Sequence, residues 1–173
     1  MTALFSSKGI SVYQKKFSQI IIRSKSEGKF ADTINKASSL LPPSDYLRVA
    51  ISDDYILAKQ SYDQWSLIGL KEKQDKEILK IISNININDD VLASNYTYGQ
   101  VYFLISGNNK DHYLNKLTHF DLREKSFPKS TMAQTSIARI ECSIYNIKDD
   151  YLITCGSSFE GYFKDRIQDA INL

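Results

Sequence analysis

Residues 91–107 read VLASNYTYGQVYFLISG, and this stretch contains the strongest fold signal in the chain. Two runs, 91–97 and 100–106, are rich in the β-branched and aromatic residues that strands favour. Gly99 separates the runs and Gly107 ends the second one, so we expect both glycines to occupy turn conformations that a β-carbon would strain. The stretch therefore predicts two strands separated by a tight connection.

Similar elements are predicted on both sides of this stretch. Apolar residues recur at helical spacing in some segments and at strand spacing in others, and one helix must end before Pro42-Pro43. Upstream we expect strands at 17–23, 47–52, 55–61 and 64–70, and helices at 27–40 and 71–85. Downstream we expect helices at 109–120 and 159–171, and strands at 135–145 and 151–155. In the helix at 71–85, the expected apolar set is Ile78, Leu79, Ile81 and Ile82.

This order of elements predicts an α+β architecture built of two ferredoxin-like halves of the β-α-β-β-α type. Residues 1–16 lack clear periodicity and are predicted to form an N-terminal arm. The first half is expected at 17–86 and the second at 87–173. Together they are expected to form one continuous globular unit, large enough to bury a core without disulfides or metal.

The composition excludes several classes of protein. The net charge is +2, and because acidic and basic residues are interspersed, no electrostatic footprint for nucleic acid is present. No apolar run approaches the roughly 20 residues needed to span a bilayer, and the N-terminus does not resemble a secretory signal. We therefore expect a cytoplasmic protein that binds neither nucleic acid nor membrane.

Cys142 and Cys155 are the two cysteines of the chain. The residues around them are typical of a hairpin, and a turn centred on Lys148 and Asp149 would place the two cysteines opposite each other. Opposed residues approach closely enough for a strained disulfide. In a reducing cytoplasm we expect two structural thiols, with redox pairing and metal binding as the alternatives.

Residues typical of a catalytic centre are not found together in the sequence. His112 and His119 fall in an expected helix, where a surface or capping role accounts for them. The acidic pairs fall at expected turns, and the sequence has neither a Gly-x-Ser-x-Gly motif nor a glycine-rich phosphate loop. We therefore predict no catalytic, cofactor-binding or metal-binding residue. The acidic pairs are Asp53-Asp54, Asp89-Asp90 and Asp149-Asp150.

In their order and spacing, the motifs of the second half resemble the gamma subunit of heterotetrameric sarcosine oxidase. In that family a segment like Asp-Gln-Ser-His-Gly-Arg enters a strand that ends in Ser-Gly. A helix follows, then Asp-Leu, Phe-Pro, an Ala-Gln-Thr-x-Ile-Ala strand, a hairpin and a helix opened by Ser-Phe. The corresponding residues here are Thr97, Gly99, Ser106-Gly107, Asp121-Leu122, Phe127-Pro128, Ala133-Gln134-Thr135, Ile137-Ala138 and Ser158-Phe159. In the first half, Asp63-Gln64-Trp65-Ser66-Leu67 is similar to the family's Asp-Glu-Trp-Leu-Leu strand. The chain departs from the family at Tyr98, Gln100 and Ser157, where the family has His, Arg and commonly Arg.

The resemblance implies a fold related to the folate-binding aminomethyltransferase of glycine cleavage and to the N-terminal domain of the tRNA-modification GTPase. In the family, FAD, FMN, NAD and tetrahydrofolate are held by partner subunits, and the gamma subunit packs chiefly on alpha in a complex with beta and delta. The complex oxidises sarcosine to glycine, with hydrogen peroxide and formaldehyde or methylene-tetrahydrofolate as the other products. The resemblance thus implies a non-catalytic subunit that binds no cofactor itself.

A subunit of this kind needs an apolar surface for its partner, and we expect the isolated chain to self-associate through that surface. Trp65 is expected either in the core or at the interface. The structural and interface candidates are Tyr13, Trp65, Tyr96, Tyr98, Gly99, Gly107 and Phe127.

Two alternatives remain open. The chain could act independently as a folate-binding, aminomethyltransferase-like protein, which would require a carboxylate that hydrogen-bonds a pterin. Asp63 and Glu141 are the candidates for that role. The chain could instead be the same kind of subunit in a complex that oxidises another N-methyl amino acid, such as N-methylglutamate or dimethylglycine.

Overall fold

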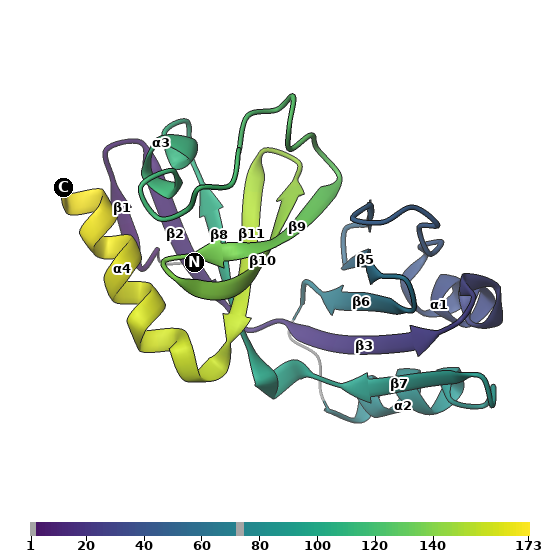
Figure 1. The fold of residues 1–173 in the computed structure, drawn as a ribbon. Helices are drawn as coiled ribbons and strands as arrows, with labels where there is room; N and C mark the ends of the chain where they lie inside the picture. The colour runs from purple at the N-terminus through teal and green to yellow at the C-terminus, as the bar shows by residue number, and fades with distance from the viewer. Residues whose placement is uncertain (1–2, 72–74) are drawn as a thin grey trace. The chain divides into compact units, whose positions relative to one another are not determined.

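The computed structural model describes residues 3–71 and 75–173, which fold as two compact units (Figure 1). The central unit consists of residues 16–98. The terminal unit combines the two ends of the chain, residues 3–15 and 99–173. Each unit has one antiparallel sheet and its own hydrophobic core.

The central unit is a ferredoxin-like fold with one additional edge strand. Its sheet contains, in spatial order, β4 (Val49–Ile51), β5 (Tyr55–Ser61), β6 (Gln64–Gly69), β3 (Ser18–Ser24) and β7 (Val91–Asn95). Its helices are η1 (Glu27–Lys29), α1 (Ala31–Ser38), α2 (Asp75–Ile85) and η2 (Thr97–Gly99). Without β4, the chain order is β-α-β-β-α-β and both central strands pair antiparallel with their neighbours. Residues 72–74 of the helix predicted at 71–85 lie outside the described residues.

Trp65 lies within the core of the central unit. It is fully buried on β6 and packs in one cluster with residues of β3, α1 and α2. Its ring meets Phe30 edge-on, with 5.1 Å between ring centroids, and its Nε1 donates a hydrogen bond of 3.1 Å to the carbonyl oxygen of Pro43. The ammonium group of Lys59, opposite Trp65 on β5, lies 4.8 Å from the ring centroid. Trp65 is therefore a core residue.

The terminal unit has the same strand order, but its fourth strand comes from the N-terminus. Its sheet contains, in spatial order, β1 (Phe5–Ser7), β2 (Ile10–Lys15), β8 (Gln100–Ser106), β11 (Asp150–Gly156), β10 (Ile140–Ile147) and β9 (Thr131–Ile137). Its helices are α3 (Lys110–Leu114), η3 (Ser157–Phe159) and α4 (Glu160–Asn172). In the ferredoxin-like pattern the fourth strand follows the second helix in the chain. Here β2 takes the place of that fourth strand in the sheet, beside β8, although it precedes β8 in the chain.

The predicted arm and domain boundary are therefore corrected. Residues 1–16 were expected to form an arm, whereas β2 pairs with β8 from Ser11 opposite Ser106 to Lys15 opposite Tyr102. The boundary expected at 86/87 lies at 98/99, because β7 pairs with β3 of the central unit. In β2, apolar and polar residues alternate clearly only from Ile10 to Val12, which is too short for a strand prediction. Its partner strand is about ninety positions away, so no local turn motif indicates the pairing either.

Two further predicted elements differ. The single strand expected at 135–145 is two strands, β9 and β10, joined by Ala138 and Arg139, which have positive φ values of 53° and 67°. The helix expected at 109–120 ends as α3 at Leu114. No helix in the described part of the chain is long and apolar enough to cross a membrane.

The predicted opposition of the two cysteines is confirmed. Cys142 on β10 lies directly opposite Cys155 on β11, and both are buried free thiols. A hydrogen bond between the two thiols, together with burial, raises the pKa of Cys142 above its ordinary value. Because the thiolate is the reactive form, Cys142 is a poor nucleophile in this setting.

Two glycine-containing turns contact each other at one end of the β2–β8 pair. Gly107 has a φ of 110°, and a β-carbon there would overlap the carbonyl oxygen of Gly9. The backbone N–H of Asn109 donates to that same oxygen at 3.1 Å, and the Asn109 side chain donates to the carbonyl of Lys8 at 2.7 Å. Gly99, by contrast, ends η2, and the glycines with positive φ in the described residues are Gly9 and Gly107. The strained conformation predicted for Gly107 is confirmed, and the one predicted for Gly99 is wrong.

We predict that Gly107→Val lowers the free energy of unfolding by at least about 2 kcal/mol, because it combines a left-handed backbone with a steric overlap. Urea denaturation followed by circular dichroism measures the effect. Gly161→Ala is the matched control, since Gly161 lies in α4 with open space around it; we expect it to raise stability by about 0.5–1 kcal/mol. Equal stability of Gly107→Val and the unmodified chain would contradict the close approach of the two turns.

We predict that Trp65→Ala costs roughly 3–5 kcal/mol of stability, because it empties the centre of a packed core. The same denaturation experiment measures this loss. Tyr62→Ala, which removes an exposed aromatic ring from the neighbouring β5–β6 turn, should change stability by less than about 0.5 kcal/mol. A comparably small effect at Trp65 would place its role outside the core.

Candidate partner surface

The aromatic candidates divide into buried and exposed residues. Trp65 and Phe127 are buried, Tyr13 is half-buried on β2, and Tyr96 and Tyr98 are exposed. A side chain must be accessible to contact another protein. Of these five, the two tyrosines after β7 are therefore the best placed to contact a partner.

Phe127 belongs to the core of the terminal unit. Its ring packs edge-on against Phe120, with centroids 5.1 Å apart, and lies 5.8 Å from the ring of Tyr151. Its carbonyl oxygen accepts a hydrogen bond of 2.7 Å from the side chain of Asn146. These contacts give Phe127 a structural role in anchoring the long connection between α3 and β9.

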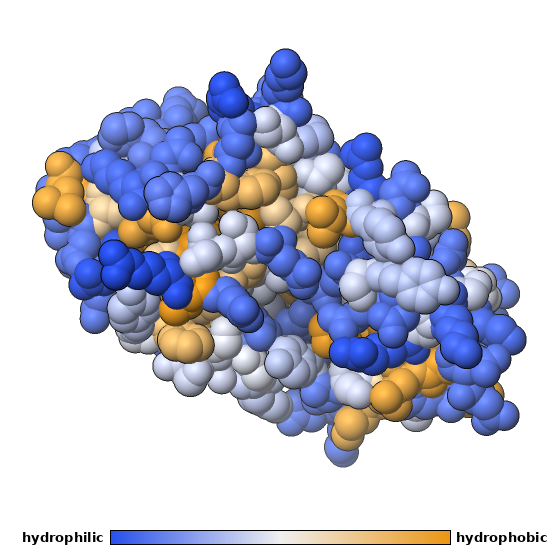
Figure 2. All heavy atoms as spheres, viewed as in Figure 1, coloured by the Kyte–Doolittle hydropathy of each residue, from blue (hydrophilic) through white to orange (hydrophobic). Residues whose placement is uncertain are grey.

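Several exposed apolar side chains of the central unit come from α2, β7, η2 and the residues that directly follow α2 and β7. We name this group the β7 edge surface; its members are Leu79, Ile87, Leu92, Tyr96 and Tyr98. The most exposed are Ile87 at 77% and Tyr98 at 73%. Figure 2 shows apolar residues gathered at the lower right, over the region where Figure 1 labels α2 and β7. Leu92 alternates with Val91 and Ala93, which pack in the core with α2, so it lies on the sheet face opposite the helix. Exposed apolar side chains gathered along one edge of a unit are typical of an interaction site.

Tyr98 is fixed against the beginning of α2. Its hydroxyl donates a hydrogen bond of 2.9 Å to a carboxylate oxygen of Asp75, and this bond raises the pKa of the Tyr98 hydroxyl above its ordinary value. Leu79 lies one helical turn beyond Asp75 and therefore on the same face of α2. The ring of Tyr98 is thus held in one position while remaining exposed, which lowers the entropy cost of binding through it.

The edge of the sheet beside this surface is partly closed to further strands. At Ala93 in β7, the backbone N–H donates to Asn86 Oδ1 at 2.6 Å, and Asn86 Nδ2 donates to the carbonyl of Ala93 at 3.0 Å. The Asn86 amide therefore occupies the backbone groups that an added strand would use. Recognition at this edge must rely mainly on side chains.

A shallow hollow of about 480 Å³ lies next to Ile87, between α1 and α2. Its lining is mixed, with apolar Ala37 and Ile81 beside the basic side chains of Lys36 and Lys80. Apolar side chains at the centre with polar or charged side chains at the rim are the usual composition of a protein–protein interface.

The residues considered for a catalytic or ligand-binding role lie on separate elements of the structure. His112 stacks edge-on against Tyr113, and His119 lies beyond the end of α3. Asp63 lies in the β5–β6 turn of the central unit, where it accepts a hydrogen bond from Ser61, and Glu141 is exposed on β10 of the terminal unit. Among the described residues, no group of three His, Cys, Asp or Glu side chains is placed to hold a metal ion.

The acidic pairs have structural partners. Asp90 pairs with Lys29 at 3.1 Å, Asp149 pairs with Lys129 at 2.7 Å, and Asp54 pairs with Lys71. The hydrogen bond from Lys129 lowers the pKa of Asp149 below its ordinary value.

Asp121 and Leu122 also have a structural function. The Asp121 carboxylate accepts hydrogen bonds from the guanidinium group of Arg123 and from the Ser126 hydroxyl, with the shortest distances at 2.6 Å. These bonds lower the pKa of Asp121. Leu122 is buried in the core of the terminal unit. This motif therefore shapes the connection between α3 and β9.

Three members of the β7 edge surface were not identified from the sequence. Leu79 was assigned to the apolar face of its helix, but it is 56% exposed while Ile78 beside it is buried. Leu92 alternates with buried Val91 and Ala93 on β7, as a strand with one exposed face requires. The one available signal was Ile87, which lies with Ile85 in the otherwise polar segment NININDD; Ile85 is buried and Ile87 is exposed.

Comparison with known proteins agrees with this fold. The profile of the sarcosine oxidase, gamma subunit family matches residues 23–172. A chain of heterotetrameric sarcosine oxidase from Corynebacterium sp. U-96, solved in complex with pyrrole 2-carboxylate, superposes with a TM-score of 0.82 at 13% identity, over 98% of this chain and 87% of that one. The glycine cleavage system aminomethyltransferase T from Bartonella henselae gives a TM-score of 0.67 at 10% identity, over 92% of this chain and 45% of that one. A search of curated proteins gave no significant match.

The two structural similarities confirm the predicted α+β fold, including its relation to the aminomethyltransferase. The family profile extends from β3 to α4, and so includes nearly all of the central unit and the larger part of the terminal unit. The chain therefore belongs to the sarcosine oxidase gamma subunit family.

Proposed function

We propose that this chain is a non-catalytic subunit of a sarcosine-oxidase complex and that it binds chiefly to the large alpha subunit, in an assembly with beta and delta. The family match over residues 23–172 carries the proposal. The dispersal of the histidines and carboxylates supports it, because a catalytic centre requires such groups within hydrogen-bonding reach of each other.

The β7 edge surface is the region we assign to the partner. Exposed aromatic and aliphatic side chains supply most of the binding energy at protein interfaces when they are buried by a partner. Tyr98 is held in place by Asp75, and the neighbouring edge of β7 is occupied at Ala93 by the Asn86 amide. A partner would therefore bind here through side-chain packing.

The chemistry of the complex would then belong to the other subunits. FAD, FMN, NAD and tetrahydrofolate are proposed to bind there, and the substrate is proposed to be sarcosine. This chain would contribute assembly and stability. An isolated chain with an uncovered apolar surface would tend to self-associate.

Independent folate binding is the alternative, and the similarity in fold to aminomethyltransferase T is the observation that favours it. Its candidate carboxylates, Asp63 and Glu141, belong to different units. Fluorescence titration of the isolated chain with tetrahydrofolate tests this alternative. Loss of binding in both the Asp63→Ala and Glu141→Ala variants would support it, and a chain that does not bind folate would exclude it.

The main experiment is affinity purification of the chain from its native cells, followed by mass spectrometry and a visible spectrum of the eluate. We expect a yellow, stoichiometric complex that contains a large flavin-binding subunit. A colourless chain that elutes alone would contradict the subunit proposal.

We predict that Tyr98→Ala weakens binding to the partner by roughly tenfold or more, because it removes an immobilised aromatic ring from the proposed interface. The yield of the partner in the same purification, at matched expression, measures this loss. Tyr62→Ala is the control: Tyr62 belongs to the same unit and is 68% exposed, but it lies in the β5–β6 turn. Equal partner yields from the two variants would remove Tyr98 from the interface.

A further inference from the structure

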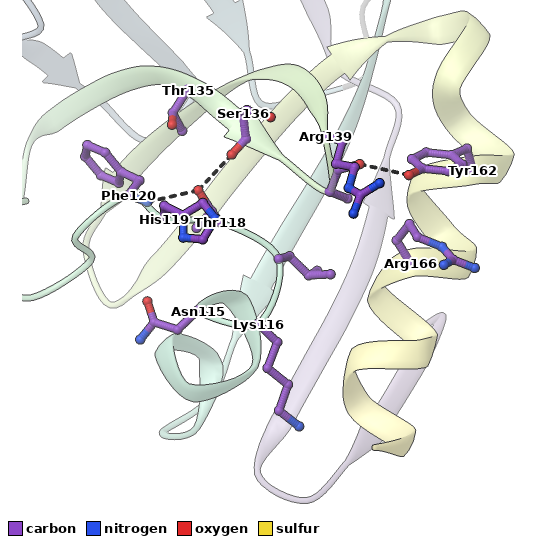
Figure 3. A pocket seen from close by; sticks show the side chains of 12 residues that line it. Asn115, Lys116, Thr118, His119, Phe120, Thr135, Ser136, Arg139, Tyr162 and Arg166 are labelled. Carbon is purple, nitrogen blue, oxygen red and sulfur yellow. Dashed lines mark hydrogen bonds between the residues drawn. The ribbon is translucent and has the colours of Figure 1, made fainter.

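A pocket of about 740 Å³ lies in the terminal unit, where the tip of the β9–β10 hairpin meets α4 and the segment after α3 (Figure 3). This volume is within the range of small-molecule sites, which is about 300–1,000 Å³. The pocket is formed entirely by the terminal unit, so it is distinct from the β7 edge surface.

The lining of this pocket is strongly basic. Three cationic side chains, Lys116, Arg139 and Arg166, line it together with His119. None of the twelve residues drawn around it is acidic. Figure 3 shows Arg139 beside Tyr162 of α4 at the upper right, Arg166 below them on the same helix, and Lys116 at the bottom of the view. Because the whole chain carries a net charge of only +2, this is a local concentration of positive charge.

Arg139 is presented by a backbone conformation that its own side chain disfavours. Two-residue hairpin turns with positive φ at both positions strongly prefer Asn-Gly or Gly-Gly, yet here the turn is Ala138-Arg139. Two tertiary hydrogen bonds hold it: the Ala138 N–H donates to the carbonyl of Leu117 at 2.8 Å, and the Tyr162 hydroxyl donates to the carbonyl of Ala138 at 3.0 Å. Backbone strain imposed by its surroundings is typical of functional positions.

The Arg139 guanidinium group has its donors available. Within the part of the chain that the structure describes, it makes no ion pair and no side-chain hydrogen bond. A guanidinium group offers five N–H donors in a planar arrangement that matches carboxylate and phosphate oxygens. A hairpin tip fixed at Ala138 therefore presents an unused anion-binding group at the pocket.

The other two cations are also held in place. Lys116 Nζ donates to the carbonyl of Ala170 at 3.0 Å and lies 5.0 Å from the ring centroid of Tyr113, which leaves two of its three donors. The Arg166 guanidinium lies 5.7 Å from the ring centroid of Tyr162 and pairs on one side with Asp169 at 2.7 Å. Side chains ordered in advance lose less entropy when they bind a ligand.

From this geometry we propose that the pocket binds a small organic molecule that carries two or more carboxylate or phosphate groups, with Arg139 as the principal contact and Lys116 and Arg166 as supporting cations. A ligand with several anionic groups fits better than a single ion, because the cations come from three separate segments around a pocket of this size. The proposal does not depend on the partner proposed above.

Isothermal titration calorimetry of the purified full-length chain tests the proposal, with citrate as the carboxylate probe and pyrophosphate as the phosphate probe. Each titration is made at about 20 mM and about 200 mM NaCl, because attraction between charges weakens as the salt concentration rises. The variants are Arg139→Gln, Arg139→Gly and, as the matched control, Arg23→Gln. Arg23 is an exposed arginine on β3 of the central unit, so its substitution changes the net charge equally.

We expect at least one probe to bind the unmodified chain with a Kd below about 1 mM at low salt. Both Arg139 variants should weaken this binding by about tenfold or more, and Arg23→Gln should leave it within about twofold. The probe that binds more tightly identifies the anionic group. Arg139→Gly should also raise Tm by a few degrees, because glycine suits the positive φ at this position, so its loss of binding cannot be due to unfolding.

Two results would overturn the proposal. One is the absence of measurable heat with either probe up to about 10 mM at low salt. The other is an unfavourable result with the variants. An equal Kd for the Arg139 variants and the unmodified chain would show that Arg139 does not contact the probe, and an equal loss in Arg23→Gln would show that net charge alone attracts it.

Discussion

The antiparallel pairing of β2 with β8 determines how the chain is divided between its two units. Ile10 and Val12 of β2 lie in the same buried cluster as Phe103 and Ile105 of β8, so the N-terminal strand is part of the core. Without β2, the long apolar strand β8 would be an exposed sheet edge, which proteins avoid. Because β2 is fixed there, residues 16–98 form the central unit as an insertion in the terminal unit.

Local turn chemistry explains which elements could be predicted from the sequence. The β10–β11 hairpin was predicted with the correct register, because a turn at Lys148 and Asp149 places Cys142 and Cys155 at equal distances from its centre. The β9–β10 hairpin was missed, because Ala138-Arg139 is not a turn dipeptide. Its conformation is imposed by hydrogen bonds from Tyr162 and to Leu117, residues about twenty positions away in each direction.

The candidate surface was predicted in part. The sequence placed Tyr96 and Tyr98 correctly as accessible side chains, but it could not separate Trp65 and Phe127 from them, because aromatic residues are frequent both in cores and at interfaces. What distinguishes them is the face of the sheet or loop on which each lies, which depends on strand register. Leu79 illustrates the same limit in a helix: it follows buried Ile78 directly, and a rotation of about 100° per residue moves it to the exposed face.

The two candidate surfaces are supported by separate cores, and this has a consequence for their roles. The β7 edge surface is built on the Trp65 core, whereas the Arg139 pocket is built on the core of the terminal unit. One surface is apolar and has a pinned tyrosine, so it suits a protein partner; the other is cationic and hollow, so it suits a small anion. Because Tyr98 and Arg139 belong to units with separate cores, we expect a change at Tyr98 to leave anion binding intact, and a change at Arg139 to leave assembly intact. A glycine at position 139 would suit the positive φ of this turn better than an arginine does. A role of the Arg139 side chain in binding an anion explains why an arginine is found there.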